Sequence, residues 1–64
     1  MEVVFRDYRG YRPRYVNGEE RASWKNSPVI HEYLNQLGEE GWELVGVGSR
    51  HNGEMPAYFK RRKG

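Results

Sequence analysis

The stretch LNQLGEEGWELVGV, residues 34–47, decides the fold because it joins the end of a helix, a chain reversal and the start of a strand. Leu34 and Leu37 have the spacing of one helix face. Gly41 is the residue type that most often ends a helix in the left-handed conformation. Trp42 then begins an apolar run typical of a buried strand. The stretch predicts a helix followed directly by a strand, and it indicates no chemistry of its own.

Upstream of this stretch, the sequence predicts that the helix occupies residues 28–40. Ser27 is expected to cap the first free N–H groups, and Pro28 is expected in the first turn, where its missing N–H costs nothing. Gly38 lies inside the helix and should weaken it by up to about 1 kcal/mol relative to alanine. The apolar helix face is expected to comprise Ile30, Tyr33, Leu34 and Leu37.

Alternating apolar residues predict strands at residues 2–8, 42–49 and 55–62. Asn52-Gly53 is a strong hairpin signal. A two-residue turn there pairs His51 with Glu54, and therefore Val47 with Tyr58 and Gly46 with Phe59. Residues 11–25 are mostly polar and contain a second Asn-Gly, at 17–18, so a hairpin arm and a loop both remain open for them.

These elements predict one α+β domain over residues 1–64, a small antiparallel β-sheet in the order β-(arm)-α-β-β with one helix packed on one face. The core is expected to contain Val3, Phe5, Ile30, Tyr33, Leu34, Leu37, Trp42, Leu44 and Phe59. The other sheet face is expected to carry Val4, Tyr8, Val45, Val47 and Tyr58, flanked by Arg6, Lys60 and Arg62.

The small size of the chain predicts that it associates with further copies. A chain of 64 residues buries only about 60% of its unfolded surface, so its core is marginal. The sequence has no cysteine and only two histidines, which excludes disulfides and leaves little for a structural metal. A homo-oligomer that covers the apolar outer sheet face is therefore expected.

Charge and hydropathy place limits on partners and location. The net charge is only +2, which argues against tight non-specific binding to nucleic acid. No apolar run approaches the roughly 18 residues that span a bilayer. The first residues, MEVVFRDY, lack the pattern of a signal peptide. We expect a cytoplasmic protein without a membrane partner.

The first strand with EVVF, the helix ending LNQLGEEGWELVGV, the short turn and a final strand ending YFKRR are similar to the bacterial and phage family named domain of unknown function 4177. The most specific part is LGEEGWELV, Leu37 to Val45, supported by Phe59 to Arg61. The matched parts cover about half of the chain. The resemblance implies a compact sheet-plus-helix domain and transfers no functional site. Residues 9–26 are longer and richer in Arg and Tyr than the family pattern, so any role of theirs is not inherited.

Known catalytic and cofactor patterns are incomplete in this sequence. His31-Glu32 begins like the helix motif of zinc proteases, but the second histidine would fall at Asn35. The glycines of GVGSRHNG, residues 46–53, precede a hairpin turn, whereas a dinucleotide site needs a helix there. We therefore expect no catalytic residues, no cofactor and no metal, and hence no enzyme.

Arginine and tyrosine alternate in RDYRGYRPRY, residues 6–15. Arginine binds phosphate and tyrosine stacks on bases, so this pattern suits single-stranded nucleic acid or a nucleotide. Arginines in an edge arm can equally pair with Glu19 and Glu20. The favoured function is a small non-catalytic oligomeric interaction module. The alternative is a nucleic-acid or phosphate-ligand binder that uses Arg6, Arg9, Tyr11, Arg12, Arg14, Tyr15, Lys60 and Arg62.

Overall fold

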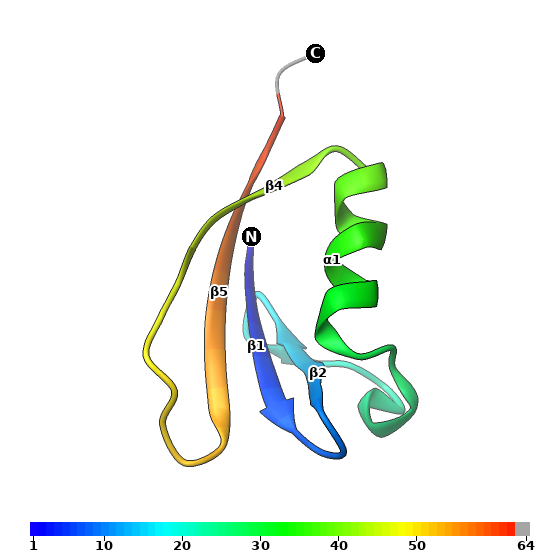
Figure 1. The fold of residues 1–64 in the computed structure, drawn as a ribbon, viewed down its shortest axis with the longest axis vertical. Coiled ribbons are helices and arrows are strands. Elements are labelled where there is room, and N and C mark those ends of the chain that lie inside the picture. Colours follow the sequence, from blue (N-terminus) through cyan, green and yellow to red (C-terminus); the bar gives the residue numbers. More distant parts are fainter. Residues whose placement is uncertain (63–64) are drawn as a thin grey trace.

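The protein folds around an antiparallel five-stranded sheet in the order β3-β2-β1-β5-β4, in a computed structural model that describes residues 1–62 (Figure 1). The elements along the chain are the strands β1 (Glu2–Asp7), β2 (Tyr11–Val16) and β3 (Glu19–Glu20), the 3-10 helix η1 (Trp24–Asn26), the helix α1 (Ile30–Glu39), and the strands β4 (Trp42–Val47) and β5 (Glu54–Arg61). The predicted α+β class, with one helix packed on an antiparallel sheet, is confirmed.

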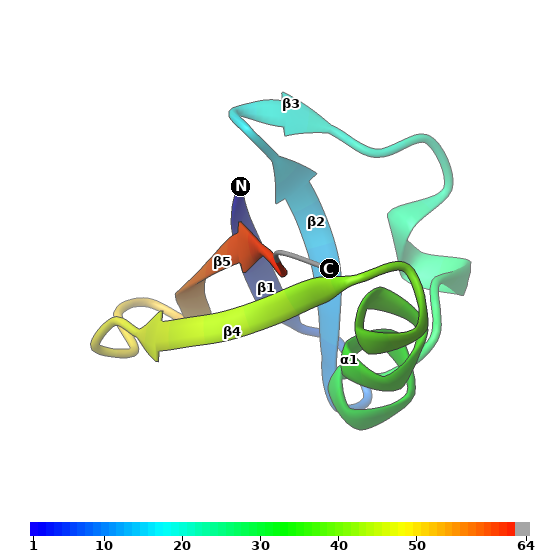
Figure 2. The ribbon, with the colours of Figure 1, turned by 90° about the horizontal axis from the view of Figure 1, so that it is seen from above.

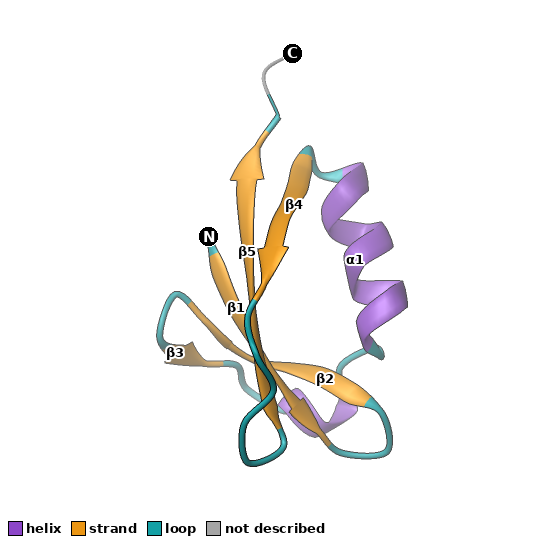
Figure 3. Ribbon diagram, turned by 60° about the vertical axis from the view of Figure 1, so that its left-hand side comes forward, coloured by secondary structure: helices purple, strands orange, loops and turns teal. Residues whose placement is uncertain are grey.

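The sheet is curved, and α1 closes its open side. Seen from above, β2, β1, β5 and β4 follow a curve, and the helix lies between the two ends of that curve (Figure 2). The helix contacts both β4 and β2. In a view turned about the vertical axis, α1 runs alongside β4 (Figure 3). The short helix η1 contacts β2. The concave face of the sheet and the helix together enclose the core.

The core combines four side chains of β1 and β5 with two of the helix. Its buried apolar residues are Val3, Phe5, Tyr33, Leu37, Ala57 and Phe59. The rings of Phe5 and Tyr33 meet edge to face at a centroid distance of 6.0 Å, a favourable aromatic geometry. Ile30, Leu34 and Trp42 are partly buried against this core, as predicted. The prediction for Leu44 is wrong, because its side chain is 43% exposed.

The predicted pairing between β4 and β5 is correct only at the turn. His51 pairs with Glu54, but Val47 then pairs with Ala57 and Gly46 with Tyr58. A bulge between Leu44 and Gly46 shifts the register again, so that Leu44 lies opposite Phe59. The Gly48 N–H donates to the Pro56 carbonyl, and an added Cβ at Gly48 would lie 2.6 Å from Pro56 Cγ. The pairing of β4 with β5 is therefore irregular at two places, near Gly48 and between Leu44 and Gly46. For this reason it differs from the register that a regular two-residue hairpin would give.

The polar segment 11–25 contributes a full strand to the sheet. β2 pairs with β1 along its length, with a bulge between Val4 and Phe5, and the buried Pro13 lies beside that bulge. Proline is tolerated there because the ladder is already interrupted. Asn17 and Gly18 both have positive φ, 50° and 85°, the conformation of a type I′ hairpin turn. Of the two alternatives left open, the hairpin is correct.

The helix begins two residues later than residue 28, and Ser27 does not cap it. Its N-cap residue is Val29, without a side-chain cap. Ser27 instead ends η1, where its N–H donates to the Trp24 carbonyl and its own carbonyl accepts a hydrogen bond from Arg12. The predicted end of the helix is confirmed, since Gly41 follows the C-cap with φ of +90°.

Candidate functional site

Strand β4 forms an open edge of the sheet. It pairs with β5 on one side, and no strand within residues 1–62 pairs with its other side. The peptide groups on that side therefore lack a β-ladder partner, which makes such an edge a template for another strand. The opposite edge is different, because β3 is only two residues long and both residues are glutamates. Short and charged edge strands resist pairing, so β4 is the edge at which association is favoured.

Large apolar side chains accompany this open edge. The exposed fractions are 43% for Leu44, 62% for Val45 and 52% for Val47. The strand sequence WELVGV contains neither lysine nor proline, the residues that usually protect an edge. Its single charge, Glu43, lies opposite Lys60 of β5. We call the outer side of β4, with Leu44, Val45 and Val47, the β4 edge.

The residues predicted for an oligomeric sheet face do not form one continuous face. Val4 is half-buried in the middle of the sheet, and Tyr58 is 45% exposed opposite Gly46. Val47 pairs with the buried Ala57, so its side chain belongs to the other face from that of Tyr58. Val45 lies in the bulge, and Tyr8 lies beyond the end of β1. The structure gathers Val45 and Val47 on the β4 edge and leaves the remaining three apart from them.

Two of the arginines predicted to bind an anion donate to backbone carbonyls of the protein itself. Arg12 donates to three backbone carbonyls, those of Tyr8, Arg9 and Ser27. Arg6 donates to the carbonyl of Asn52 and so holds the β4–β5 turn. These guanidinium groups stabilise turns of the protein's own backbone, which leaves fewer donors for a ligand.

Arg14 is held by carboxylates. Its Nε lies 3.0 Å from Glu20 Oε2, and its Nη1 lies 3.7 Å from Glu54 Oε2. The hydrogen bond to Glu20 raises the pKa of Arg14 above its ordinary value. The Arg14 guanidinium also lies 5.1 Å from the ring centroid of Tyr15. The sequence alternative in which an arm arginine pairs with Glu20 is therefore correct for Arg14.

The remaining predicted residues are scattered. Tyr11 packs against the core, with the Arg50 guanidinium 5.9 Å from its ring centroid. Arg9, Lys60 and Arg62 are exposed. Lys60 and Arg62 lie at the C-terminal end of β5, which is far from the β1–β2 turn that follows Asp7 (Figure 1). The eight predicted residues therefore do not form a single binding surface.

A cluster of aromatic and cationic side chains forms where the β1–β2 turn meets η1. The Tyr8 and Trp24 rings meet edge to face at 6.0 Å. Lys25 Nζ lies 5.2 Å from the Tyr8 centroid and 5.8 Å from that of Trp24. Arg9 lies 5.9 Å from the Tyr8 ring and Arg14 lies 4.9 Å from the Trp24 ring. We call these five residues the aromatic–cation cluster.

Sequence reasoning missed Trp24 and Lys25 as members of this cluster. A signal was present, because Trp24 stands in the polar segment RASWKNS without apolar neighbours that would build a core around it. A tryptophan in such a segment frequently contributes to a contact surface.

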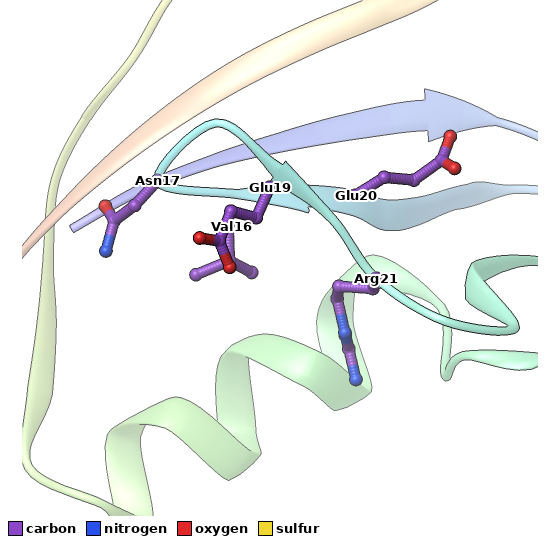
Figure 4. Close-up of a pocket in the computed structure, with 5 residues that line it drawn as sticks. All are labelled: Val16, Asn17, Glu19, Glu20 and Arg21. Atoms are coloured by element: carbon purple, nitrogen blue, oxygen red, sulfur yellow. The ribbon is translucent and has the colours of Figure 1, made fainter.

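A hollow of about 370 Å³ lies between the β2–β3 hairpin and α1 (Figure 4). Its lining residues are Val16, Asn17, Glu19, Glu20 and Arg21. Glu19 and Arg21 point toward the helix, whereas Glu20 points away from it (Figure 4). The Arg21 guanidinium lies 4.9 Å from the Tyr33 ring centroid, and its buried Nη1 has no hydrogen-bond partner. Burial raises the pKa of Tyr33, and the charge of Arg21 opposes that shift.

The hollow is lined by both acidic and basic side chains, Glu19, Glu20 and Arg21, so its charge does not favour one kind of ligand.

Within residues 1–62, no group of three or more His, Cys, Asp or Glu side chains is placed to hold a metal ion. The described helices are all too short or too polar to cross a membrane.

Comparison of the chain with protein-family models, curated proteins and solved structures gives no match. The resemblance to the domain of unknown function 4177 family stays a prediction. Function is therefore inferred from the β4 edge and the aromatic–cation cluster.

Proposed function

We propose that the protein is a small non-catalytic interaction module that pairs with a second copy of itself through the β4 edge. The observation that carries this proposal is an edge strand without lysine or proline whose Leu44, Val45 and Val47 are 43–62% exposed. Pairing would give the free peptide groups of β4 hydrogen-bond partners and would cover these apolar side chains.

A second copy suits this edge because antiparallel strand pairing is compatible with a two-fold axis. In a two-fold interface the same patch serves both copies, so one exposed strand is sufficient. A pairing centred on Val45 places Leu44 opposite Gly46 of the second copy and Glu43 opposite Val47 of the second copy. The two Glu43 carboxylates are then separated, and no pair of like charges faces directly across the interface.

Self-association would also add stability to a chain whose core is small. The core cluster of the described residues has only six buried members, and the sequence has no cysteine to form a disulfide. Chains of this size commonly obtain further stability from a partner subunit. The β4 edge supplies a surface for such a partner without any change in the fold.

Sedimentation equilibrium at micromolar concentrations tests the proposal. We expect the wild-type chain to have twice the protomer mass of 7.6 kDa. Val45→Lys should give a folded monomer, because it places a charge on the paired edge. Tyr58→Lys is the matched control, since Tyr58 is similarly exposed, at 45%, but lies on β5.

Circular dichroism would verify that both variants fold. A wild-type monomer at these concentrations would contradict the proposal. Dissociation by Tyr58→Lys but not by Val45→Lys would replace edge pairing with stacking of the outer sheet faces.

A further inference from the structure

We propose that the aromatic–cation cluster binds a segment of single-stranded nucleic acid, with phosphates on Arg9 and Lys25 and a base stacked against Trp24 or Tyr8. The cluster is formed by the β1–β2 turn and η1, and it shares no residue with the β4 edge. The inference is therefore independent of self-association.

The two segments that form the cluster are held together by Arg12. Its Nε donates to the Tyr8 carbonyl at 2.8 Å, its Nη2 to the Arg9 carbonyl at 3.2 Å, and its Nη1 to the carbonyl of Ser27, at the end of η1. One guanidinium group thus fixes the turn that carries Tyr8 and Arg9 to the segment that carries Trp24 and Lys25. A surface that is already ordered loses less conformational entropy when it binds.

The backbone beside the cluster adopts an uncommon conformation on both segments. Arg9 has φ of +53° and Ser23, directly before Trp24, has φ of +54°. Left-handed backbone is uncommon for residues other than glycine, and it is enriched where structure serves binding. Arg9 belongs to the β1–β2 turn and Ser23 precedes η1, so these turns determine where the side chains of the cluster lie.

The cations of the cluster differ in their availability for a phosphate. The ion pairs within residues 1–62 are made by Arg14, with Glu20 and Glu54. Arg9 and Lys25 are exposed, and no carboxylate of residues 1–62 lies within ion-pair distance of either. Two cations beside two aromatic rings match the repeating unit of a single strand, which alternates phosphates with flat bases.

A single strand fits this surface better than a duplex or a lipid surface does. The bases of a duplex are stacked on each other, so their faces cannot reach Tyr8 or Trp24. A lipid surface favours apolar side chains that insert, whereas these rings pack edge to face and carry cations over them. Tyr8 is 38% exposed, so part of the residue is free to contact a base.

Fluorescence anisotropy of labelled oligouridine and oligothymidine, titrated with the full chain at several salt concentrations, tests the inference. We expect weak binding whose logarithm falls with the logarithm of salt at a slope of about −1.4, the value for two neutralised phosphates on a single strand. Lys25→Gln and Arg9→Gln should each make that slope shallower by about 0.7. Trp24→Leu should weaken binding by roughly tenfold while it leaves the slope unchanged.

Lys60→Gln and Arg62→Gln are matched controls, because they remove the same charge at the other end of the molecule (Figure 1). They should leave affinity and slope unchanged. Equal losses in the control and cluster variants would overturn the inference, since binding would then follow net charge alone. No binding at low salt by the folded chain, or binding to anionic phospholipid vesicles with none to either oligonucleotide, would also overturn it. The Val45→Lys variant should bind like the wild type, which separates this site from the β4 edge.

Discussion

Arg12 shows how one side chain can hold two distant segments of a small protein. A guanidinium group offers five N–H donors in a rigid plane, and here it donates to the carbonyls of Tyr8, Arg9 and Ser27. Ser27 is only 7% exposed, so water cannot readily replace the bond to its carbonyl. Arg12 therefore stabilises the backbone, although it lies in the stretch whose composition predicts phosphate binding.

Replacing Arg12 by methionine should destabilise the fold by roughly 1–3 kcal/mol, because a buried carbonyl loses its donor while the aliphatic volume is retained. Urea unfolding measures the change. Arg9→Met is the control, since Arg9 is exposed, and it should shift the free energy of unfolding by no more than about 0.5 kcal/mol. Similar shifts for the two variants would show that the three hydrogen bonds of Arg12 contribute little.

For single residues, the sequence predicts which side chains are buried better than it predicts which groups the polar side chains bind. Val3, Phe5 and Phe59 were predicted to be buried and are buried. The guanidinium groups of Arg6 and Arg12 bind oxygen atoms, but those oxygens belong to the protein's own backbone. A guanidinium group can donate to a neutral carbonyl oxygen as well as to an anionic oxygen, so only the tertiary structure decides which of them it meets.

Among the elements, the end of α1 was predicted from Gly41. A second glycine, Gly38, lies nearby, and the two differ in the backbone conformation that they adopt. Gly38 is helical and has open space around the position of a Cβ atom. Gly41 has φ of +90°, a conformation that strains any residue with a side chain. The same residue type therefore weakens the helix at one position and terminates it at the other.

Gly38→Ala should stabilise the protein by up to about 1 kcal/mol, because alanine is the better helix former and meets no neighbour. Gly41→Ala should destabilise it by about 1 kcal/mol or more, since the left-handed conformation costs a Cβ atom about that much. Thermal unfolding of the two variants, measured side by side, gives the signs directly. Shifts of the same sign would contradict the conformations assigned to these glycines.

The elements that depend on local sequence were the predictable ones. Asn52-Gly53 was expected as a hairpin turn, whereas a hairpin and a loop were both open for the segment with Asn17-Gly18. Both Asn-Gly pairs have positive φ. The register of β4 was not predictable, because an alternating pattern cannot reveal a bulge between Leu44 and Gly46. A separate irregularity between His51 and Val47, around Gly48, pairs Val47 with Ala57 and so places it on the face of Ala57. This separates the residues that the sequence placed on one apolar face.

For the whole molecule, strand order decides which surface is available. β1 and β5 occupy the interior of the sheet, and β4 is left as an edge. The order arises from pairings between distant segments, such as Val3 with Ala57, which no local pattern specifies. The sequence therefore predicts an apolar surface that requires a partner, whereas the structure locates the exposed apolar residues of β4 on an edge.

Pairing through the β4 edge should make the stability of the protein depend on its concentration, because a second copy binds the folded chain and not the unfolded one. A tenfold increase in concentration is worth about 1.4 kcal/mol per dimer, which corresponds to a few degrees in the melting temperature of a chain this small. Calorimetry over a hundredfold range of concentration, which is two tenfold increases, measures how the melting temperature changes. Val45→Lys should abolish the dependence and Tyr58→Lys should retain it. A wild-type melting temperature that stays constant over this range would mean that folding and association are not linked, and that the core of this chain is sufficient by itself.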